Sequence, residues 1–279
     1  MKVCLESTRF FAFFGILLFS TSISPASTIT LAAVGDIILD RGVAQQMEKR
    51  GLDYPFAETK NTLRAADIAF GNLECPISTQ PKRSGKPVVF RAAPTTAKAL
   101  SNAGFDVLSL ANNHALDCGI EGLKETQSIL HRQKIGFCGI GSTAAPGNKP
   151  LVIEKNNVRV AFVGFSQFGG QGIAPADDAT VRRDITRAKK SADVVVASFH
   201  WGVENETRPD ARQKALARLA AKCGADLILG HHPHILQGWE LLPAADGRRA
   251  LAVYSLGNFV FRSARLETRR NHSLSRDAR

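Results

Sequence analysis

The sequence predicts a protein of the α/β class, and three observations lead to this prediction. Short apolar runs typical of buried strands alternate with segments whose apolar residues recur at helical spacing. Hydrophobic residues make up 44% of the 279 residues and charged residues 22%, as in an ordinary globular protein with one substantial core or two small ones. Side chains that bind metals follow several of the apolar runs directly, and in an α/β sheet ligands bind beyond the carboxyl ends of the strands.

Each predicted strand is a short apolar run bounded by glycine or polar residues. Two pairs of runs flank turn dipeptides, Asn156-Asn157 and Asp246-Gly247, and are therefore predicted to be hairpins. Strands are expected at residues 28–34, 67–70, 88–91, 107–111, 151–154, 158–164, 194–199, 226–229, 239–242 and 250–254.

Helices are predicted between most of these strands. The run 210–223 is the clearest, because Leu216, Leu219, Ala220 and Cys223 fall on one helical face. The other helices are expected at residues 41–50, 57–66, 95–103, 119–134 and 178–190. Residues 76–87 and 167–176 are rich in turn-forming residues and are predicted loops, the second long enough to move near a site.

The N-terminal segment has the pattern of a secretory signal. Lys2 and Arg9 precede an apolar run, and Ser24-Pro25-Ala26-Ser27 offers small residues for cleavage. Residues 1–27 are therefore predicted to be a signal peptide, with an uncleaved membrane anchor as the alternative. The mature protein is expected outside the cytoplasm, either periplasmic, secreted or associated with the cell envelope.

The C-terminal segment 262–279 is polar and rich in arginine, which predicts a basic disordered tail and leaves 28–261 as one domain. The net charge of +11 favours an anionic partner, although part of the excess lies in this tail. Aromatic residues are few and are not interleaved with basic ones, so nucleic-acid binding is not expected. No G-x-x-x-x-G-K-[ST] pattern occurs, so phosphate binding of that type is not expected either.

Four cysteines follow the signal, namely Cys75, Cys118, Cys138 and Cys223. Export would place them in an oxidising compartment, where three pairings are open. No C-x-x-C pair occurs, so a thiolate zinc site is not expected, and isolated buried thiols remain the other expectation.

Candidate metal ligands follow five of the predicted strands. The residues in question are Asp36, Asn72, Glu74, Asn113, His114, His200, His231 and His234. Since the carboxyl ends of parallel strands meet at one edge, these side chains are expected to converge on one rim. A mixture of carboxylate, amide and imidazole ligands suits two nearby divalent cations such as Mn²⁺, Zn²⁺ or Fe²⁺.

Such a two-metal site activates a bridging water and stabilises the charge that develops during displacement. An imidazole beside the metals is then able to protonate the leaving group. His114 is the candidate for this role, and Asp117, three residues further on, is the candidate for orienting it.

Six motifs carry a resemblance to a known family. They are GDIILDR (35–41), GNLECPI (71–77), LANNHALDCGIEGL (110–123), SFHWGVE (198–204), GHHPHILQ (230–237) and YSLGNFVF (254–261). In this order they resemble the CapA family of bacterial capsule and poly-gamma-glutamate synthesis proteins. The fold of that family is similar to the calcineurin-like metallophosphoesterases, so the resemblance implies a four-layer αββα sandwich.

The resemblance also implies roles for individual residues. It makes Asp36 and Glu74 carboxylate ligands, Asn113 an amide ligand with His114 as its catalytic partner, and His200, His231 and His234 the imidazole ligands. Phosphoesterases have Gly-His-x-His where this chain has one more residue between the outer histidines, and either spacing of ligands fits. The residues expected to contact the substrate or the metal ligands are Asp40, Arg41, Asn72, Glu204 and His232.

Two departures from the pattern are visible. Ile38 stands where the phosphoesterase Asp-x-His motif has its histidine, which predicts an under-ligated metal and weakens the case for phosphodiesterase chemistry. Family members usually continue with further strands after GNFVF, so the basic tail is typical of a truncated or frameshifted end.

The resulting hypothesis is an exported CapA-like protein in the synthesis, export or processing of poly-gamma-glutamate or another anionic capsule polymer, with a metal-dependent hydrolytic site. Its expected partners are that polymer or its synthase complex. One alternative is a non-catalytic scaffold of a membrane-bound polymer synthase. The other is a metallophosphoesterase that acts on small phosphate esters.

Overall fold

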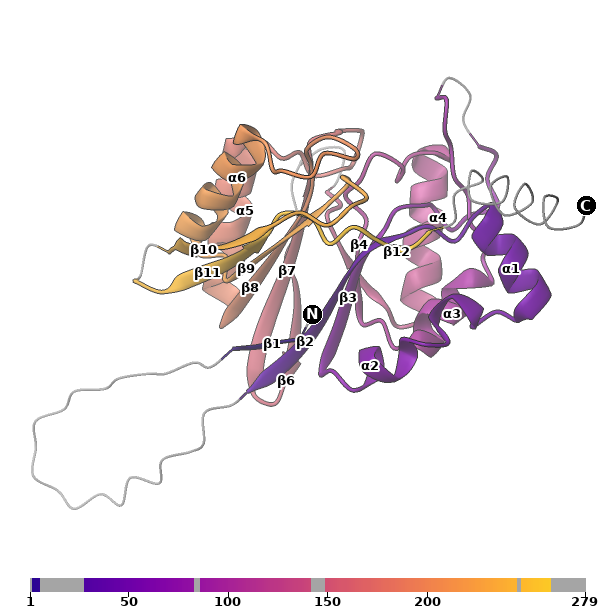
Figure 1. The fold of residues 1–279 in the computed structure, drawn as a ribbon, viewed down its shortest axis with the longest axis horizontal. Coiled ribbons are helices and arrows are strands. Elements are labelled where there is room, and N and C mark those ends of the chain that lie inside the picture. The colour runs from indigo at the N-terminus through magenta and orange to yellow at the C-terminus, as the bar shows by residue number, and fades with distance from the viewer. Residues whose placement is uncertain (1, 6–27, 83–85, 142–148, 245–246, 262–279) are drawn as a thin grey trace, which may run out of the picture.

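A computed structural model describes residues 2–5, 28–82, 86–141, 149–244 and 247–261. The predicted signal peptide, apart from residues 2–5, and the predicted tail at 262–279 lie outside these residues. Two six-stranded sheets form the centre of the structure, and helices cover the outer face of each sheet (Figure 1).

The first sheet has the strand order β1-β2-β3-β4-β5, and β12 also pairs with β2. Strands β2 to β5 are parallel, while β1 is antiparallel to β2. The strands are β1 (Lys2–Leu5), β2 (Ile29–Ile37), β3 (Ile68–Leu73), β4 (Val107–Ser109), β5 (Gly136–Cys138) and β12 (Asn258–Val260).

The second sheet has the strand order β10-β11-β9-β8-β7-β6. Its four inner strands are parallel, and the edge strands β6 and β10 are each antiparallel to their neighbour. The strands are β6 (Leu151–Lys155), β7 (Val158–Ser166), β8 (Val194–His200), β9 (Leu227–His231), β10 (Trp239–Pro243) and β11 (Arg249–Val253).

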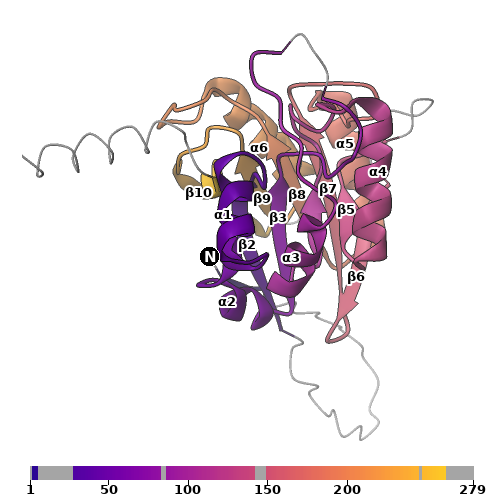
Figure 2. The same ribbon diagram turned by 90° about the vertical axis from the view of Figure 1, so that its right-hand side faces the viewer.

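The helices form the two outer layers. Helices α1 to α4 lie on the first sheet, and α5 and α6 lie on the second, as the perpendicular views show (Figures 1 and 2). Their bounds are α1 (Gly42–Arg50), α2 (Lys60–Arg64), α3 (Thr96–Ala103), α4 (Gly119–Arg132), α5 (Asp178–Ser191) and α6 (Ala211–Cys223), with a 3₁₀ turn at Tyr54–Phe56. Within the described part of the chain, no helix has both the length and the apolar character needed to cross a bilayer.

Strand alternation explains the layers. In β8, Val194 and Val196 face the first sheet, whereas Val195 and Phe199 face α5 and α6. A third apolar cluster lies between the first sheet and helices α1 to α4. The inner strands β8 and β9 are buried on both faces and are predominantly apolar, as expected for strands covered on both sides, and the predicted αββα sandwich is confirmed.

Local signals in the sequence place several element ends. Asp210 and Gln213 form a capping box at the start of α6, and Gly104 ends α3 in the left-handed conformation, as its stop signal predicted. Asn156 and Asn157 both have positive φ, which produces the predicted hairpin turn between β6 and β7.

Other expectations differ from the structure. The predicted strand at 88–91 is wrong, because this segment is a loop, and the nearest strand-like pairing is an isolated bridge between Ile77 and Ala92, just after it. Strand β5 was not predicted, since its three residues include a glycine and have no alternating pattern. Strand β1 lies in the segment where the signal sequence was expected.

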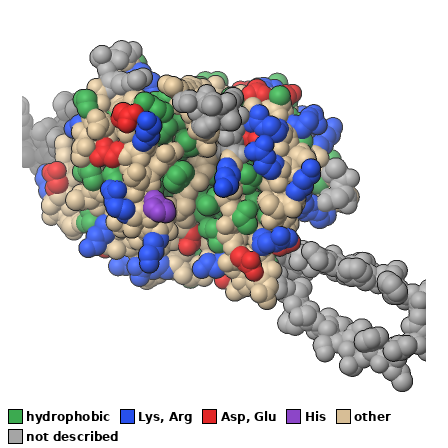
Figure 3. All heavy atoms as spheres, turned by 180° about the vertical axis from the view of Figure 1, so that it is seen from behind, with side chains coloured by type: hydrophobic (Ala, Val, Ile, Leu, Met, Phe, Trp, Pro, Cys, Tyr) green, Lys and Arg blue, Asp and Glu red, His purple; other side chains and the backbone are tan. Residues whose placement is uncertain are grey.

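The surface carries both basic and acidic side chains. Figure 3 shows Lys and Arg side chains scattered over one face of the molecule among acidic and apolar side chains. On that face the basic residues are dispersed, which is typical of a solvated surface.

Candidate metal centre

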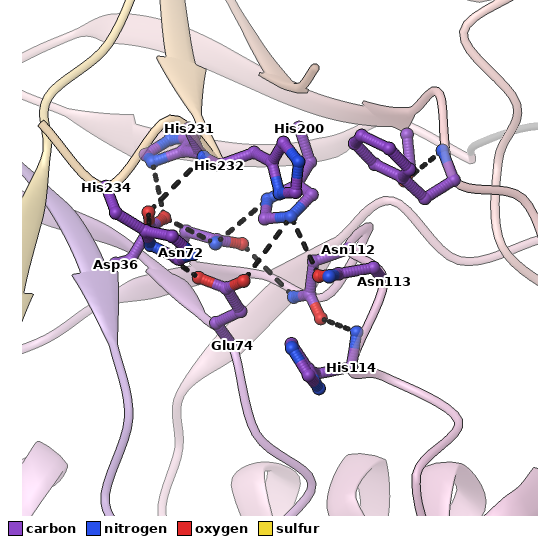
Figure 4. A network of polar contacts seen from close by, with 12 residues as sticks. Asp36, Asn72, Glu74, Asn112, Asn113, His114, His200, His231, His232 and His234 are labelled. Carbon is purple, nitrogen blue, oxygen red and sulfur yellow. Dashed lines mark hydrogen bonds and ion pairs between the residues drawn. The ribbon is translucent and has the colours of Figure 1, made fainter. Parts of the chain in front are cut away.

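The candidate site lies where the carboxyl ends of both sheets meet. Asp36 lies near the end of β2 beside Asn72 of β3, and His200 at the end of β8 is in register with His231 of β9. Glu74 follows β3 directly. Figure 4 shows these side chains pointing toward one another from the two sheets.

Glu74 occupies the centre of the cluster. Its carboxylate is fully buried, with Oε1 3.5 Å from His200 Nε2 and Oε2 3.8 Å from His234 Nδ1. No described residue forms a hydrogen bond with either oxygen. Burial, followed by the nearby charge of Asp36, raises the pKa of Glu74 well above its usual value. A buried carboxylate flanked by imidazole nitrogens and lacking hydrogen bonds is what a cation-binding position requires.

Asp36 is the second fully buried carboxylate. Asn72 Nδ2 donates to its Oδ1 at 2.8 Å, and the backbone N–H of His232 donates to Oδ2 at 3.3 Å. His231 Nδ1 and His234 Nδ1 lie 3.4 and 3.3 Å from the two oxygens. Burial alone would raise the pKa of Asp36, but these two imidazoles hold it below its usual range.

Three groups of described residues bring ligand atoms close enough to hold a cation. They are Asp36, Glu74 and His234; Glu74, His200 and His232; and Glu204, His232 and His234. Glu74 is shared by the first two groups, and each of its oxygens faces a different histidine. Glu74 is therefore common to two of the three candidate cation groups among the described residues.

The environment favours the neutral form of two of the histidines. Burial lowers the pKa of His200 well below its usual value and lowers the pKa of His232 to about 4. Burial also acts to lower the pKa of His234, but the carboxylate of Asp36 more than reverses this effect. Neutral imidazole is the form that binds a metal, so His200 and His232 need no deprotonation at neutral pH.

His231 lies deeper than the other histidines. It is fully buried, with its ring 6.2 Å from that of Phe70, and both ring nitrogens lack a hydrogen-bond partner among the described residues. Its contact with the cluster is the 3.4 Å approach to Asp36, and it belongs to none of the three groups found in the described part of the chain.

Three amides connect the ligands. Asn113 Oδ1 lies 2.9 Å from His200 Nε2, and Asn72 Nδ2 lies 3.4 Å from His200 Nδ1. Asn112, which the sequence analysis did not single out, donates to Asn72 Oδ1 and to the carbonyl of Leu73, and its own Oδ1 accepts from the N–H of His114. The two asparagines before His114 stand out in the sequence, but the role of Asn112 depends on hydrogen bonds that the sequence does not reveal.

His114 and Asp117 form a closely coupled pair beside the cluster. His114 Nδ1 lies 2.6 Å from Asp117 Oδ2, and Asp117 is fully buried. Lys86 Nζ donates to Asp117 Oδ1 at 2.8 Å, and Phe90 N–H donates to Oδ2. These contacts fix the orientation of the imidazole, whose ring also lies 4.5 Å from that of Phe90.

The other residues expected near a substrate have different surroundings. Asp40 accepts from Lys82 Nζ and from the N–H of Arg91, so it holds the loop after β3 in place. Arg41 places its guanidinium 4.7 Å from the centre of the Phe90 ring. Glu204 is exposed at the edge of the site and lies near His232 and His234.

The last described segment joins the two sheets at the site. Leu256 N–H donates to the carbonyl of Gly230 in the second sheet, and Gly257 accepts from the N–H of Asp36 in the first. A Cβ atom on Gly35 would lie 1.8 Å from the Gly257 oxygen, so this close approach requires glycine. The amide oxygen Oδ1 of the following Asn258 lies 3.0 Å from His234 Nδ1, from which it accepts a hydrogen bond.

Two stacked sheets with outer helices and a mixed carboxylate, amide and imidazole cluster at their shared carboxyl edge define an α/β sandwich of the metallophosphoesterase type. The fold is similar to that of a hypothetical protein from Thermus thermophilus, with a TM-score of 0.53 and 19% identity, covering 81% of this chain and 75% of the other. It is also similar to a novel phosphatase from Mycoplasma pneumoniae, with a TM-score of 0.51 and 14% identity, covering 80% of this chain and 70% of the other. At these sequence identities the similarity shows a shared fold only.

The chain belongs to the bacterial capsule synthesis protein family PGA_cap, whose family model matches residues 30–263. It is 36% identical to the PGA biosynthesis protein CapA of Bacillus subtilis (strain 168), covering 86% of this chain and 65% of the relative. It is 34% identical to the capsule biosynthesis protein CapA of Bacillus anthracis, and the match covers 84% of this chain and 60% of that relative. The chain therefore spans slightly less than two thirds of the length of these curated relatives.

A further relative is described as a probable polyglutamine synthesis accessory protein of Mycobacterium tuberculosis (strain CDC 1551 / Oshkosh). The identity is 26%, and the match covers 65% of this chain and 54% of the relative.

Proposed function

We propose that this protein acts outside the cytoplasm in the synthesis, export or processing of poly-gamma-glutamate or a related anionic capsule polymer, as a metal-dependent hydrolase. The observation that carries the hydrolase proposal is the buried Glu74 carboxylate, which no described residue hydrogen-bonds and which lies between two imidazoles. The family and the names of the CapA relatives support the polymer. The signal pattern of the first 27 residues supports export.

The residues fit one or two divalent cations such as Mn²⁺, Zn²⁺ or Fe²⁺. Asp36, Glu74, His200 and His234 would hold them, with Asn113 beside His200, because hard carboxylate and borderline imidazole donors together suit these ions. When bound, such cations supply an activated water and stabilise negative charge on the group under attack.

The chain's own residues supply the proton for the leaving group. Asp117 accepts the hydrogen on His114 Nδ1, which leaves Nε2 as the atom that gives a proton to the departing group. Lys86 and the backbone N–H of Phe90 keep Asp117 in place and balance its charge. The same carboxylate stabilises the imidazole while it carries two protons.

The test is a metal count combined with hydrolysis assays on the purified mature protein. Wild type should bind at least one cation per chain and hydrolyse poly-gamma-glutamate or phosphate esters. His114→Ala should keep the metal and lose activity, whereas Asp36→Ala should lose both. His131→Ala, at an exposed position of α4, is the matched control.

Less than one metal per chain, together with equal activity in all four proteins, would overturn the hydrolase proposal. A second function is favoured if metal binds and no substrate is turned over. The protein would then be a non-catalytic accessory of the polymer synthase, a role suggested by the name of the Mycobacterium tuberculosis relative.

A further inference from the structure

The charged side chains around the candidate metal centre are unevenly placed. The exposed acidic residue Glu204 lies at the rim beside His232 and His234. Basic side chains lie instead beside the pair of His114 and Asp117, around the loop that carries Phe90. They are Arg41, Lys82 and Lys86.

Two of these basic side chains are neutralised by buried or half-buried carboxylates. Lys82 pairs with Asp40 and Lys86 pairs with Asp117, each at 2.8 Å. Arg41 differs, because within the described part of the chain no carboxylate forms an ion pair with its guanidinium, which contacts an aromatic ring and a backbone carbonyl. The residue is exposed. Its positive charge is therefore the one on this side of the site that an anion from solution is able to neutralise.

Phe90 brings Arg41 close to the imidazole that is proposed to protonate the leaving group. Cζ of Arg41 lies 4.7 Å from the centre of the Phe90 ring, and the centre of the His114 ring lies 4.5 Å from it. The backbone N–H of Phe90 donates to Asp117 Oδ2, the same oxygen that lies 2.6 Å from His114 Nδ1. One carboxylate thus fixes both Phe90 and His114, and an anion bound by Arg41 would lie beside the leaving group.

The backbone of Arg41 is in a conformation that L-residues rarely adopt. Its φ is 54° and its ψ is −124°, which favours glycine. Such strain persists where the surroundings hold it in place, and it clusters at ligand-binding sites. Here the carboxylate of Asp40 holds it, accepting from the N–H of Arg41 at 2.8 Å and from the N–H of Arg91 at 2.9 Å.

We propose that Arg41 is a specificity-determining residue that binds a carboxylate on the leaving group of the substrate. The inference rests on the proposed hydrolysis of poly-gamma-glutamate. In that polymer the amine that departs with a proton from His114 carries an α-carboxylate on the neighbouring carbon. The planar fork of a guanidinium matches a carboxylate through two parallel hydrogen bonds. Polymers with a neutral group at this position lack the contact and are the poorer substrates.

The first experiment measures binding by the full chain after treatment with a chelator, so that no cation contributes. A gamma-linked glutamate oligomer of defined length is titrated calorimetrically, and the same oligomer with its α-carboxyls converted to amides is the neutral reference. Wild type should prefer the charged oligomer. Arg41→Ala should bind it at least about tenfold more weakly, and Arg41→Lys should lie between the two, because a lysine keeps the charge and loses the fork.

The chain offers a matched control and a test for a merely structural role. Arg50 is also exposed and lies over an aromatic ring, with its Cζ 4.9 Å from the centre of Tyr54, so Arg50→Ala should bind as wild type does. Arg41→Gly should bind as weakly as Arg41→Ala and melt no lower than wild type, since glycine adopts this backbone without strain. Loss of binding only in variants that melt well below wild type would make Arg41 structural and overturn the inference.

Hydrolysis gives a second readout on the cation-loaded protein. Wild type should have a higher kcat/KM for the charged oligomer than for the neutral one, and Arg41→Ala should bring the two values together. Inorganic phosphate is titrated in parallel. If phosphate binding depends on Arg41 and oligomer binding does not, the carboxylate assignment is overturned in favour of a phosphate ester.

The outcomes separate this inference from the proposed function. Equal binding of the charged oligomer by wild type and the folded Arg41 variants, or no binding by wild type, would overturn the inference whatever the hydrolysis assays show. A protein that binds the charged oligomer through Arg41 and hydrolyses nothing would overturn the hydrolase proposal and keep the carboxylate site.

Discussion

Replacing Glu74 with glutamine should stabilise the metal-free protein and remove most of its response to divalent cations. In the metal-free state the buried carboxylate has no hydrogen-bond donor among the described residues and lies near the charge of Asp36. A buried charged group without partners costs about 1–3 kcal/mol or more, and glutamine keeps its shape without its charge. We therefore expect the free energy of unfolding of metal-free Glu74→Gln to exceed that of wild type by about 1–3 kcal/mol.

Divalent cations should cancel or reverse this difference in stability. A ligand at one hundred times its dissociation constant stabilises the folded state by about 2.7 kcal/mol. Wild type should gain this amount, whereas Glu74→Gln should gain little, because the neutral amide replaces the carboxylate between His200 and His234. For a domain of this size, 1 kcal/mol corresponds to a shift of about 2–4 °C in the melting temperature.

Thermal unfolding followed by circular dichroism measures both effects, first after chelation and then with added Mn²⁺ or Zn²⁺. Glu121→Gln is the control, since Glu121 is 65% exposed on α4 and pairs with the exposed Lys124. Its effect should stay within about 0.5 kcal/mol in both conditions. A metal-free Glu74→Gln that melts below wild type, or a variant that gains as much from the cation as wild type does, would refute the reasoning.

Three further outcomes are expected. Gly230→Ala should prevent folding or lower the free energy of unfolding by several kcal/mol, because its Cβ would lie 1.9 Å from the backbone oxygen of Tyr254. In the control Gly238→Ala the Cβ meets nothing within 4 Å, so its melting temperature should equal that of wild type. Glu125→Gln should destabilise the protein at neutral pH, because the hydrogen bond from Ser78 lowers the pKa of Glu125 below its usual 4.5. The ionised Glu125 therefore stabilises the folded state above pH 4.5, and this stabilisation is lost as the pH falls. Urea titrations should show a difference in stability between variant and wild type at pH 7 that closes below pH 4. Chelation of protein purified without chelator should lower its melting temperature, and Mn²⁺ or Zn²⁺ should restore it.

The layers of the fold were accessible from sequence because their signals are local. The first four residues of β8, Val194 to Ala197, form an uninterrupted apolar run, which is typical of a strand buried on both faces, and α6 carries both its capping box and its apolar stripe within its own residues. The segment at 88–91 shows the limit of such signals. Its apolar Val89 and Phe90 are fixed by contacts with Arg41, Asp117 and His114, so tertiary contacts outweigh their preference for a strand.

The location of the site could be predicted, but its internal geometry could not. Asp36, Glu74 and His200 follow apolar runs, and the topology of parallel strands brings such positions to one edge. The difference between His231 and His232 depends on a backbone φ of 95° at His232 and on the ring of Phe168, which comes from a loop more than sixty positions earlier. No pattern of spacing contains that information.

The hydrogen bond between the backbone N–H of His232 and Asp36 joins positions 196 apart in the chain. Contacts of such sequence separation require a large loop to close, so they form after the local helices and strands in folding. The cluster of candidate metal ligands therefore forms when both sheets dock, and partial opening of either sheet would separate these side chains. A cation that binds this cluster would accordingly link the two halves of the domain, and its occupancy would report the integrity of the whole fold.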